Sequence, residues 1–105
     1  MADTLKILES TIRERRIGDP ALSYVAKLSQ SGRAKIAQKV GEEATEAVIA
    51  AMEGDPAKLT SEAADLIFHL MVLLADGGVS LDDVLAELDR REGTSGLTEK
   101  ASRTE

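Results

Sequence analysis

Five acidic side chains occupy two short stretches of the sequence, at spacings that place several of them on one side of a helix. The first stretch contains Glu42, Glu43 and Glu46, and the second contains Glu62 and Asp65. Residues three or four positions apart are neighbours on a helix surface, so each stretch presents adjacent carboxylates. Glu43 also interrupts an apolar helical stripe, where a carboxylate costs free energy unless it is paired or binds a cation. The other members of this stripe are Ile36, Val40, Ala47 and Ala50.

The two stretches lie at matching distances from the turn Gly54-Asp55-Pro56. Glu43 and Glu46 precede the turn by about 8 to 11 residues, and Glu62 and Asp65 follow it by about 7 to 10 residues. Because a short connection makes consecutive helices pack antiparallel, these four carboxylates are expected to face one another. Four like charges at close range need a cation, and an all-oxygen set suits Mg²⁺, with Mn²⁺ as the alternative, better than zinc. Since Mg²⁺ commonly binds substrate phosphates, the pattern predicts a di- or triphosphate ligand.

Lysines beside the acids offer contacts to phosphate oxygens that a metal ion does not reach. Lys35 and Lys39 precede the first acidic stretch on the same expected helix, and Lys27 is close in sequence. We predict that these three lysines bind the substrate. The competing interpretation is an ordinary charged helix surface, in which the acids pair with Lys35, Lys39 or Lys58. The sequence alone leaves both interpretations open.

Composition restricts the class of protein. The chain has 105 residues, with 13 Lys+Arg against 19 Asp+Glu, a formal charge of −6, one histidine and no cysteine. This length fits one small domain, and the negative charge argues against nucleic acid as a partner. Without cysteine there is no disulfide, no Cys-based zinc site and no thiol nucleophile. Because no apolar run is long enough to span a bilayer and the N-terminus lacks a secretion signal, we expect a cytoplasmic protein without a membrane partner.

Helical patterns fill the chain between its turn residues, which predicts an all-α fold. Helices are expected over about residues 4–16, 33–53, 56–76 and 81–92, with a short helical turn around 23–28 and a flexible polar tail over about 93–105. Asp55 and Pro56 are typical residues for a helix start, and Ser80 begins a pattern similar to a capping box. The chain is therefore expected to form a single domain, residues 1–105, built as a short four- to five-helix bundle.

The expected helix over 56–76 predicts a homo-oligomer. Between Leu66 and Leu74 it is apolar nearly all round, and such a helix must be covered on every side. Three other short helices are too few to cover it, so homo-oligomerisation is expected to complete the bundle, with a dimer as the favoured state. The core stripe of this helix is expected to consist of Leu59, Ala63, Leu66, Leu70 and Leu73.

The acidic pattern and its flanks resemble a known enzyme family. Glu42-Glu43-x-x-Glu46, followed after fifteen residues by Glu62-x-x-Asp65, resembles the signature of the all-α nucleoside-triphosphate pyrophosphohydrolases. The flanking segments Ser23–Leu28, Lys35–Glu46, Ala64–Leu70 and Glu92–Leu97 resemble the phosphoribosyl-ATP pyrophosphatases of histidine biosynthesis, and the likeness covers almost the whole chain. The chain departs from the family pattern at Thr98, where an acid is expected, and at Phe68, where tyrosine is frequent. Neither position belongs to the acidic motif.

The resemblance implies a reaction and roles for particular residues. The implied reaction is the Mg²⁺-dependent hydrolysis of phosphoribosyl-ATP to phosphoribosyl-AMP and pyrophosphate, the second step of histidine biosynthesis. The implied metal ligands are Glu43, Glu46, Glu62 and Asp65, and Glu42 joins them as a catalytic residue. The residues predicted to close over the phosphoribosyl phosphate from the polar tail are Thr94, Ser95, Gly96 and Lys100.

Three other interpretations use the same residues. The acidic site also fits a house-cleaning pyrophosphohydrolase that acts on ordinary or damaged nucleotides, although the flanking segments favour phosphoribosyl-ATP. In a non-catalytic helical dimerisation module, the acids would have no catalytic role. A di-iron bundle requires Glu-x-x-His repeats, whereas His69 follows Asp65 by four residues and is the sole histidine. We expect His69 to support the structure or the site rather than to act in a catalytic triad.

Overall fold

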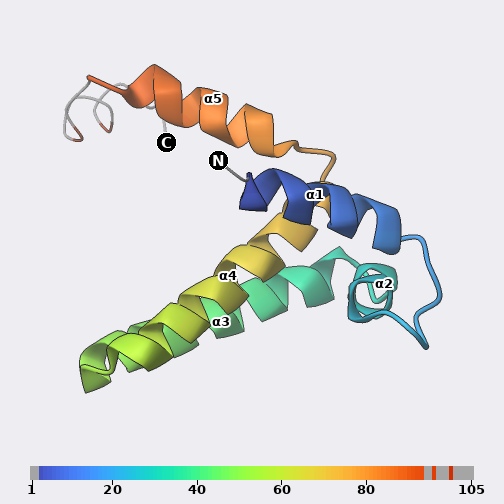
Figure 1. Ribbon diagram of the computed structural model, residues 1–105, viewed down its shortest axis with the longest axis horizontal. Coiled ribbons are helices and arrows are strands. Elements are labelled where there is room, and N and C mark those ends of the chain that lie inside the picture. Colours follow the sequence, from blue (N-terminus) through green and yellow to red (C-terminus); the bar gives the residue numbers. More distant parts are fainter. Residues whose placement is uncertain (1–2, 94–95, 97–99, 101–105) are drawn as a thin grey trace.

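The computed structural model describes residues 3–93, 96 and 100, and within these residues the chain is helical without a β-strand (Figure 1). The helices are α1 (Thr4–Arg15), α2 (Tyr24–Gln30), α3 (Arg33–Glu53), α4 (Pro56–Asp76) and α5 (Leu81–Arg91). The predicted all-α class is confirmed, and the predicted helix boundaries agree with the observed ones to within about one residue. The predicted short turn around 23–28 is the two-turn helix α2.

Local capping interactions fix the helix boundaries. At the end of α3, Gly54 adopts a left-handed conformation (φ 71°), which a glycine reaches without strain. Asp55 then accepts a hydrogen bond from the backbone N–H of Lys58 at 3.1 Å, and Pro56 occupies the first turn of α4. Ser80 and Asp83 form a reciprocal capping box at the start of α5. The chain therefore reverses direction between α3 and α4 within two residues.

Helices α3 and α4 form a long antiparallel hairpin that projects from the rest of the molecule (Figure 1). Helices α1 and α5 form a second arm, and α2 lies where the chain passes from α1 into the hairpin (Figure 1). The molecule is consequently open rather than spherical, with principal extents of 47 × 34 × 34 Å. This arrangement leaves a hollow between the two arms.

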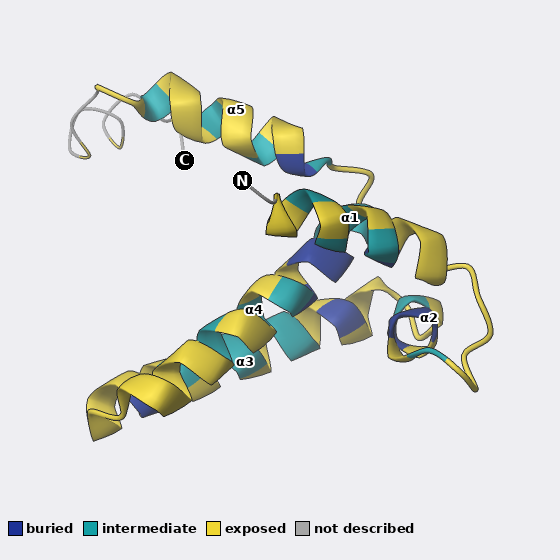
Figure 2. Ribbon diagram, viewed as in Figure 1, coloured by how far each residue is buried: buried dark blue, intermediate teal, exposed yellow. Residues whose placement is uncertain are grey.

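The buried core lies where the two arms meet, and it leaves the far end of the hairpin mostly exposed (Figure 2). Ile12, Ile36 and Val72, from three different helices, are almost fully enclosed. The core cluster also contains Val25, Leu28, Met71 and Leu81. The expected core stripe of α4 is wrong in part, because Leu59 is 37% exposed and Leu70 is 40% exposed. In α4 the buried residues are instead His69, Met71 and Val72, since α1 and α2 cover that side of the helix.

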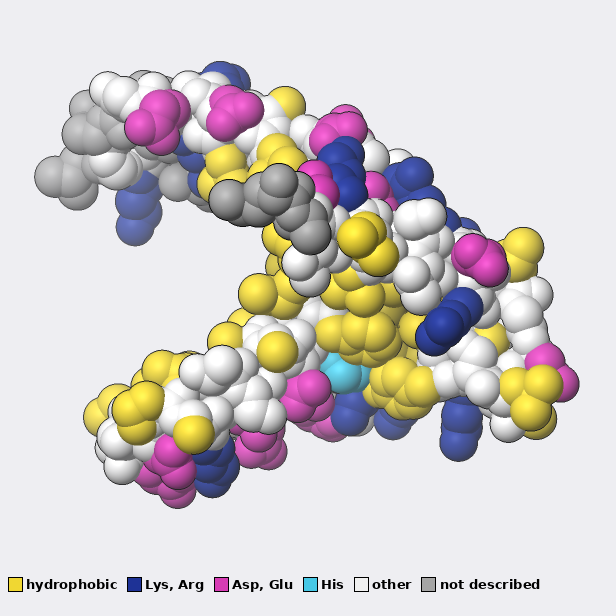
Figure 3. All heavy atoms as spheres, viewed as in Figure 1, with side chains coloured by type: hydrophobic (Ala, Val, Ile, Leu, Met, Phe, Trp, Pro, Cys, Tyr) yellow, Lys and Arg dark blue, Asp and Glu magenta, His cyan; other side chains and the backbone are white. Residues whose placement is uncertain are grey.

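Helix α5 is attached mainly to α1, through polar contacts at its first turn. The Glu9 carboxylate accepts a hydrogen bond from the Leu81 backbone N–H at 2.7 Å, and Lys6 pairs with Asp82. Large apolar side chains on α4 and α5 stay accessible, namely Leu59, Ile67, Leu70, Leu85 and Leu88. Figure 3 shows hydrophobic side chains gathered in the hollow between the arms. The bundle that the sequence predicts is therefore incomplete within one copy of the chain.

Within the described residues, no single helix has the length and apolar character needed to cross a membrane. Among the helices that the structure describes, α4 and α5 taken together have sufficient length and apolar character, but they are bent by 109° where they join.

Candidate active site

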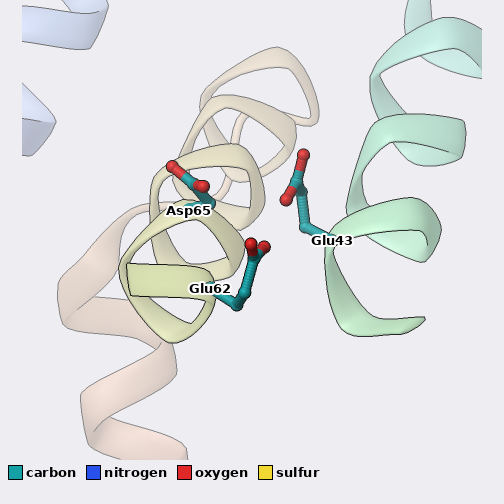
Figure 4. A group of neighbouring side chains, drawn as sticks. All are labelled: Glu43, Glu62 and Asp65. Carbon is teal, nitrogen blue, oxygen red and sulfur yellow. The ribbon is translucent and has the colours of Figure 1, made fainter. Parts of the chain in front are cut away.

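Three carboxylates from two helices converge on the exposed side of the α3–α4 hairpin. Glu43 comes from α3, and Glu62 and Asp65 come from consecutive turns of α4 (Figure 4). One oxygen from each lies within 4.8 Å of the others. The side chain of Glu43 is 15% exposed, as expected for an acid in an apolar stripe. The tight turn at Gly54 sets the two helices antiparallel and in a register that brings these acids to the same depth.

The carboxylates repel one another, as the pKa of Glu62 reflects. Partial burial raises the pKa of Glu62 above its ordinary value of 4.5, and the neighbouring charges of Glu46, Asp65 and Glu43 raise it further. Lys58 acts in the opposite direction but does not offset the repulsion. The folded chain therefore holds a concentration of negative charge that favours a bound cation.

The two remaining predicted acids lie at the edge of this group. Glu46 is exposed and lies outside the three-carboxylate group, although its charge contributes to the raised pKa of Glu62. Glu42 is exposed and accepts a hydrogen bond from the Gln38 side chain at 2.9 Å. Lys39 lies between Glu42 and Glu43, with its Nζ 3.3 Å from the first carboxylate and 3.8 Å from the second. Four carboxylates were expected to face one another. Three of them converge, and Glu46 lies outside their group.

The three predicted substrate-binding lysines share one pocket of about 290 Å³ beside the acids. Lys27 comes from α2, and Lys35 and Lys39 come from the start of α3. Glu42 also lines this pocket, so the pocket and the acidic group meet along one face of α3. The arrangement places Lys39 next to two carboxylates and brings two further cations into the same pocket.

The wall of the pocket on α2 contains Tyr24, Leu28 and Ser31, which the sequence did not single out. Together with Lys27 they follow the spacing i, i+3, i+4, i+7, so the helical period could have indicated this shared face. The Tyr24 hydroxyl lies 2.8 Å from Nε2 of the buried His69. Nδ1 of His69 lies 2.7 Å from the backbone carbonyl of Asp65. The expected supporting role of His69 therefore takes the form of a link between the pocket and the α4 turn that carries Asp65.

The predicted contribution of the tail stays a prediction. Thr94 and Ser95 lie outside the described residues, whereas Gly96 and Lys100 are described and are exposed.

Comparison with known proteins gives a consistent result over nearly the whole chain. The family described as phosphoribosyl-ATP pyrophosphohydrolase matches residues 5–92. The phosphoribosyl-ATP pyrophosphatase of Rhizorhabdus wittichii is 68% identical, over 98% of this chain and 97% of the relative. Those of Novosphingobium aromaticivorans and Erythrobacter litoralis are 67% and 64% identical, over 97% and 96% of this chain and 95% and 97% of the relatives.

The matched span contains helices α2 to α5, all of α1 except its first residue, the three converging carboxylates and the lysine pocket. The chain belongs to the phosphoribosyl-ATP pyrophosphohydrolase family.

Proposed function

We propose that this chain hydrolyses phosphoribosyl-ATP to phosphoribosyl-AMP and pyrophosphate with the help of a divalent cation. The family match and the names of the relatives support the reaction and its substrate. The observation that carries the proposal is the convergence of Glu43, Glu62 and Asp65 next to a pocket with three lysines. The carboxylates offer ligands for the cation that accompanies a polyphosphate, and the neighbouring ammonium groups offer contacts to phosphate oxygens of the substrate.

The acidic group fits a magnesium or manganese ion by its donor chemistry. All its ligand atoms are carboxylate oxygens, and a cation ligated at about 2.0 to 2.1 Å holds two ligands no more than about 4.2 Å apart. The three oxygens lie within 4.8 Å of one another, so small side-chain rotations would bring them to the separation that a bound cation requires. In this proposal Glu46 serves as a further ligand, and Glu42 orients the attacking water. When bound, such an ion would neutralise phosphate charge and polarise the scissile bond.

The lysines have a separate task in this proposal. Lys27 and Lys35 are exposed cations within the pocket and bind phosphate oxygens. Lys39 is held between Glu42 and Glu43 and so stands at the boundary of the acids and the pocket. The negative substrate is thereby attracted to an overall acidic protein by a local patch of positive charge.

We also propose that the functional unit is a homodimer. The accessible apolar side chains of α4 and α5, together with the hollow between the two arms, support a second copy as the missing part of the bundle. Burial of such residues in a monomer would require further helices that the matched span does not contain.

The decisive experiment measures pyrophosphate release from phosphoribosyl-ATP with and without Mg²⁺, beside a panel of plain nucleoside triphosphates. Mg²⁺-dependent turnover of phosphoribosyl-ATP with slow turnover of the panel is the expected result. Preferred turnover of the panel would move the protein to nucleotide house-cleaning while keeping the metal site. Absence of turnover with every substrate would contradict the catalytic role of the acids.

A further inference from the structure

The pocket beside the acids is lined by residues of α2 and the first half of α3, which raises the question of which part of the substrate it contacts. Its volume of about 290 Å³ suits a fragment of a nucleotide. Phosphoribosyl-ATP has two phosphorylated ends, a triphosphate and a separate sugar phosphate. The triphosphate is the end that reacts, so in the proposed function its phosphates must reach the carboxylates. The lysine pocket either extends the binding of that end or receives the other one.

The hydrogen-bonding character of the pocket distinguishes these two ends. A backbone carbonyl only accepts hydrogen bonds, so Nδ1 of His69 must carry the proton that it shares with Asp65. Nε2 of the neutral ring is then an acceptor, and the Tyr24 hydroxyl donates to it. The Ser31 hydroxyl donates to the Leu28 carbonyl at 2.6 Å. Both hydroxyl hydrogens are committed within the protein, and the two oxygens offer a ligand only acceptor positions.

Glu42 strengthens this acceptor character, because its carboxylate also lines the pocket. The pocket thus combines three cationic donors with three oxygen acceptors. Pyrophosphate and the end of a triphosphate present acceptors alone and are repelled by such oxygens. A sugar phosphate presents phosphate acceptors to the lysines and hydroxyl donors to the oxygens, so it complements both sets.

Charge and apolar surface indicate the same ligand. Three lysines and one carboxylate line the pocket, and Glu43 also lies 3.8 Å from Lys39. The remaining excess of positive charge attracts a phosphate monoester, which carries about −1.5 to −2 charges at neutral pH. The Tyr24 ring, which stacks on Phe68 with centroids 6.1 Å apart, and the Leu28 side chain supply an apolar wall. A sugar ring has carbon-bound faces to place against that wall, whereas a bare pyrophosphate has none.

We propose that this pocket binds the sugar-phosphate end of phosphoribosyl-ATP and that Tyr24, held by His69, determines specificity for that end. The inference rests on the proposed function for the identity of the substrate, but its binding chemistry stands on the pocket alone. Tyr24 contacts the sugar directly in this arrangement. His69 is a positioning residue, because it directs the Tyr24 hydroxyl hydrogen away from the ligand.

Calorimetric titration of the metal-free protein tests the pocket without turnover. The probes are ribose 5-phosphate and inorganic pyrophosphate. We expect Tyr24→Phe to weaken ribose 5-phosphate binding about three- to tenfold, the effect of one hydrogen bond. The same variant leaves pyrophosphate binding unchanged or tighter, because an opposing acceptor is removed. Lys27→Met weakens ribose 5-phosphate by about tenfold.

Lys6→Met is the matched control, since Lys6 pairs with Asp82 on the other arm of the molecule. It should change either affinity by less than about twofold. Absence of ribose 5-phosphate binding, or equal weakening of both probes by Tyr24→Phe, would overturn the proposal. Thermal melts check that Tyr24→Phe folds, and Lys27→Met carries the test if the loss of the His69 partner unfolds it.

Steady-state kinetics with Mg²⁺ separate this inference from the proposed function. We expect Tyr24→Phe and Lys27→Met to lower kcat/KM for phosphoribosyl-ATP more strongly than kcat/KM for ATP, which lacks the second sugar phosphate. Equal losses with both substrates would assign the pocket to the shared triphosphate and overturn the inference. A wild-type protein that does not hydrolyse phosphoribosyl-ATP would instead contradict the proposed function, and the calorimetric result would still decide what the pocket binds.

Discussion

Glu43 is the residue on which the proposed metal site depends most directly, because it alone brings a carboxylate of the converging group from α3. Glu43→Gln should lower kcat/KM for phosphoribosyl-ATP by at least about 100-fold, as for other groups that act at the transition state. Pyrophosphate release at saturating Mg²⁺ is the measurement. Glu53→Gln, on the same helix but paired with Lys58, is the matched control and should retain activity. Full activity of Glu43→Gln would show that the acids are structural.

Glu62 predicts an unusual dependence of stability on pH. Its pKa is raised in the folded chain, so ionisation disfavours folding. Below pH 4.5, the ordinary pKa of a glutamate, Glu62 is protonated in the folded and in the unfolded chain and does not lower the free energy of unfolding. As the pH rises through the raised pKa, Glu62 ionises in the folded chain, and the free energy of unfolding decreases. In metal-free buffer, Glu62→Gln should therefore melt above the wild type at neutral pH and close to it below pH 4.5.

Glu87 provides a control of opposite sign for this experiment. Hydrogen bonds from Arg90 and Arg91 lower its pKa to about 2. The ionised form thus stabilises the fold, and that stabilisation is lost as the pH falls from 4.5 toward about 2. Glu87→Gln should melt below the wild type at neutral pH, with a difference that shrinks on acidification. Parallel behaviour of the two variants would contradict both assignments.

At the scale of the helices, the first turn of α5 is held to α1 in part by the carboxylate of Glu9. The Glu9 carboxylate binds the Leu81 backbone N–H and lies 3.3 Å from Arg13. Glu9→Ala should cost about 1 kcal/mol or more, because it leaves this N–H without its partner. Amide hydrogen exchange should accelerate in the first turn of α5 and stay unchanged in the α3–α4 hairpin. Uniform acceleration along the chain would indicate global destabilisation instead.

The helix boundaries could be predicted because they depend on neighbours in sequence. Asp55 caps a turn three residues away, and Ser80 and Asp83 cap each other. The meeting of Glu43 with Glu62 and Asp65 was predictable for the same reason, since a two-residue connection leaves little freedom in the register of a helix pair.

Contacts between distant parts of the chain could not be predicted in this way. The Tyr24–His69 hydrogen bond joins residues 45 positions apart and depends on how α2 packs on α4. The exposure of Leu59 and Leu70 has a similar origin, because periodicity identifies an apolar face without showing what covers it. The periodicity of α4 predicted which face of the helix is apolar, but the helices of a single chain cover only part of that face.

At the scale of the whole molecule, the open hollow predicts an interface between two copies. Leu88 on α5 is 54% exposed in one copy, so Leu88→Glu should leave the isolated fold intact while shifting the protein from dimer to monomer. Sedimentation equilibrium of the full chain is the measurement. Leu22→Glu is the control, since Leu22 is 86% exposed on the connection between α1 and α2. A wild-type monomer, or an unchanged dimer in Leu88→Glu, would contradict the proposed interface.

The hairpin of α3 and α4 also affects the order in which the chain folds. Its connection consists of Gly54 and Asp55, so closing it costs little loop entropy, whereas the core requires contacts between residues as distant as Ile12 and Leu81. Glu43 and Glu62 should therefore meet early, and their repulsion should slow the first steps. We expect Mg²⁺ to raise the refolding rate in stopped-flow experiments, and an effect on unfolding alone would contradict this order. The ion proposed for the chemistry would then also act as a folding catalyst for the chain that binds it.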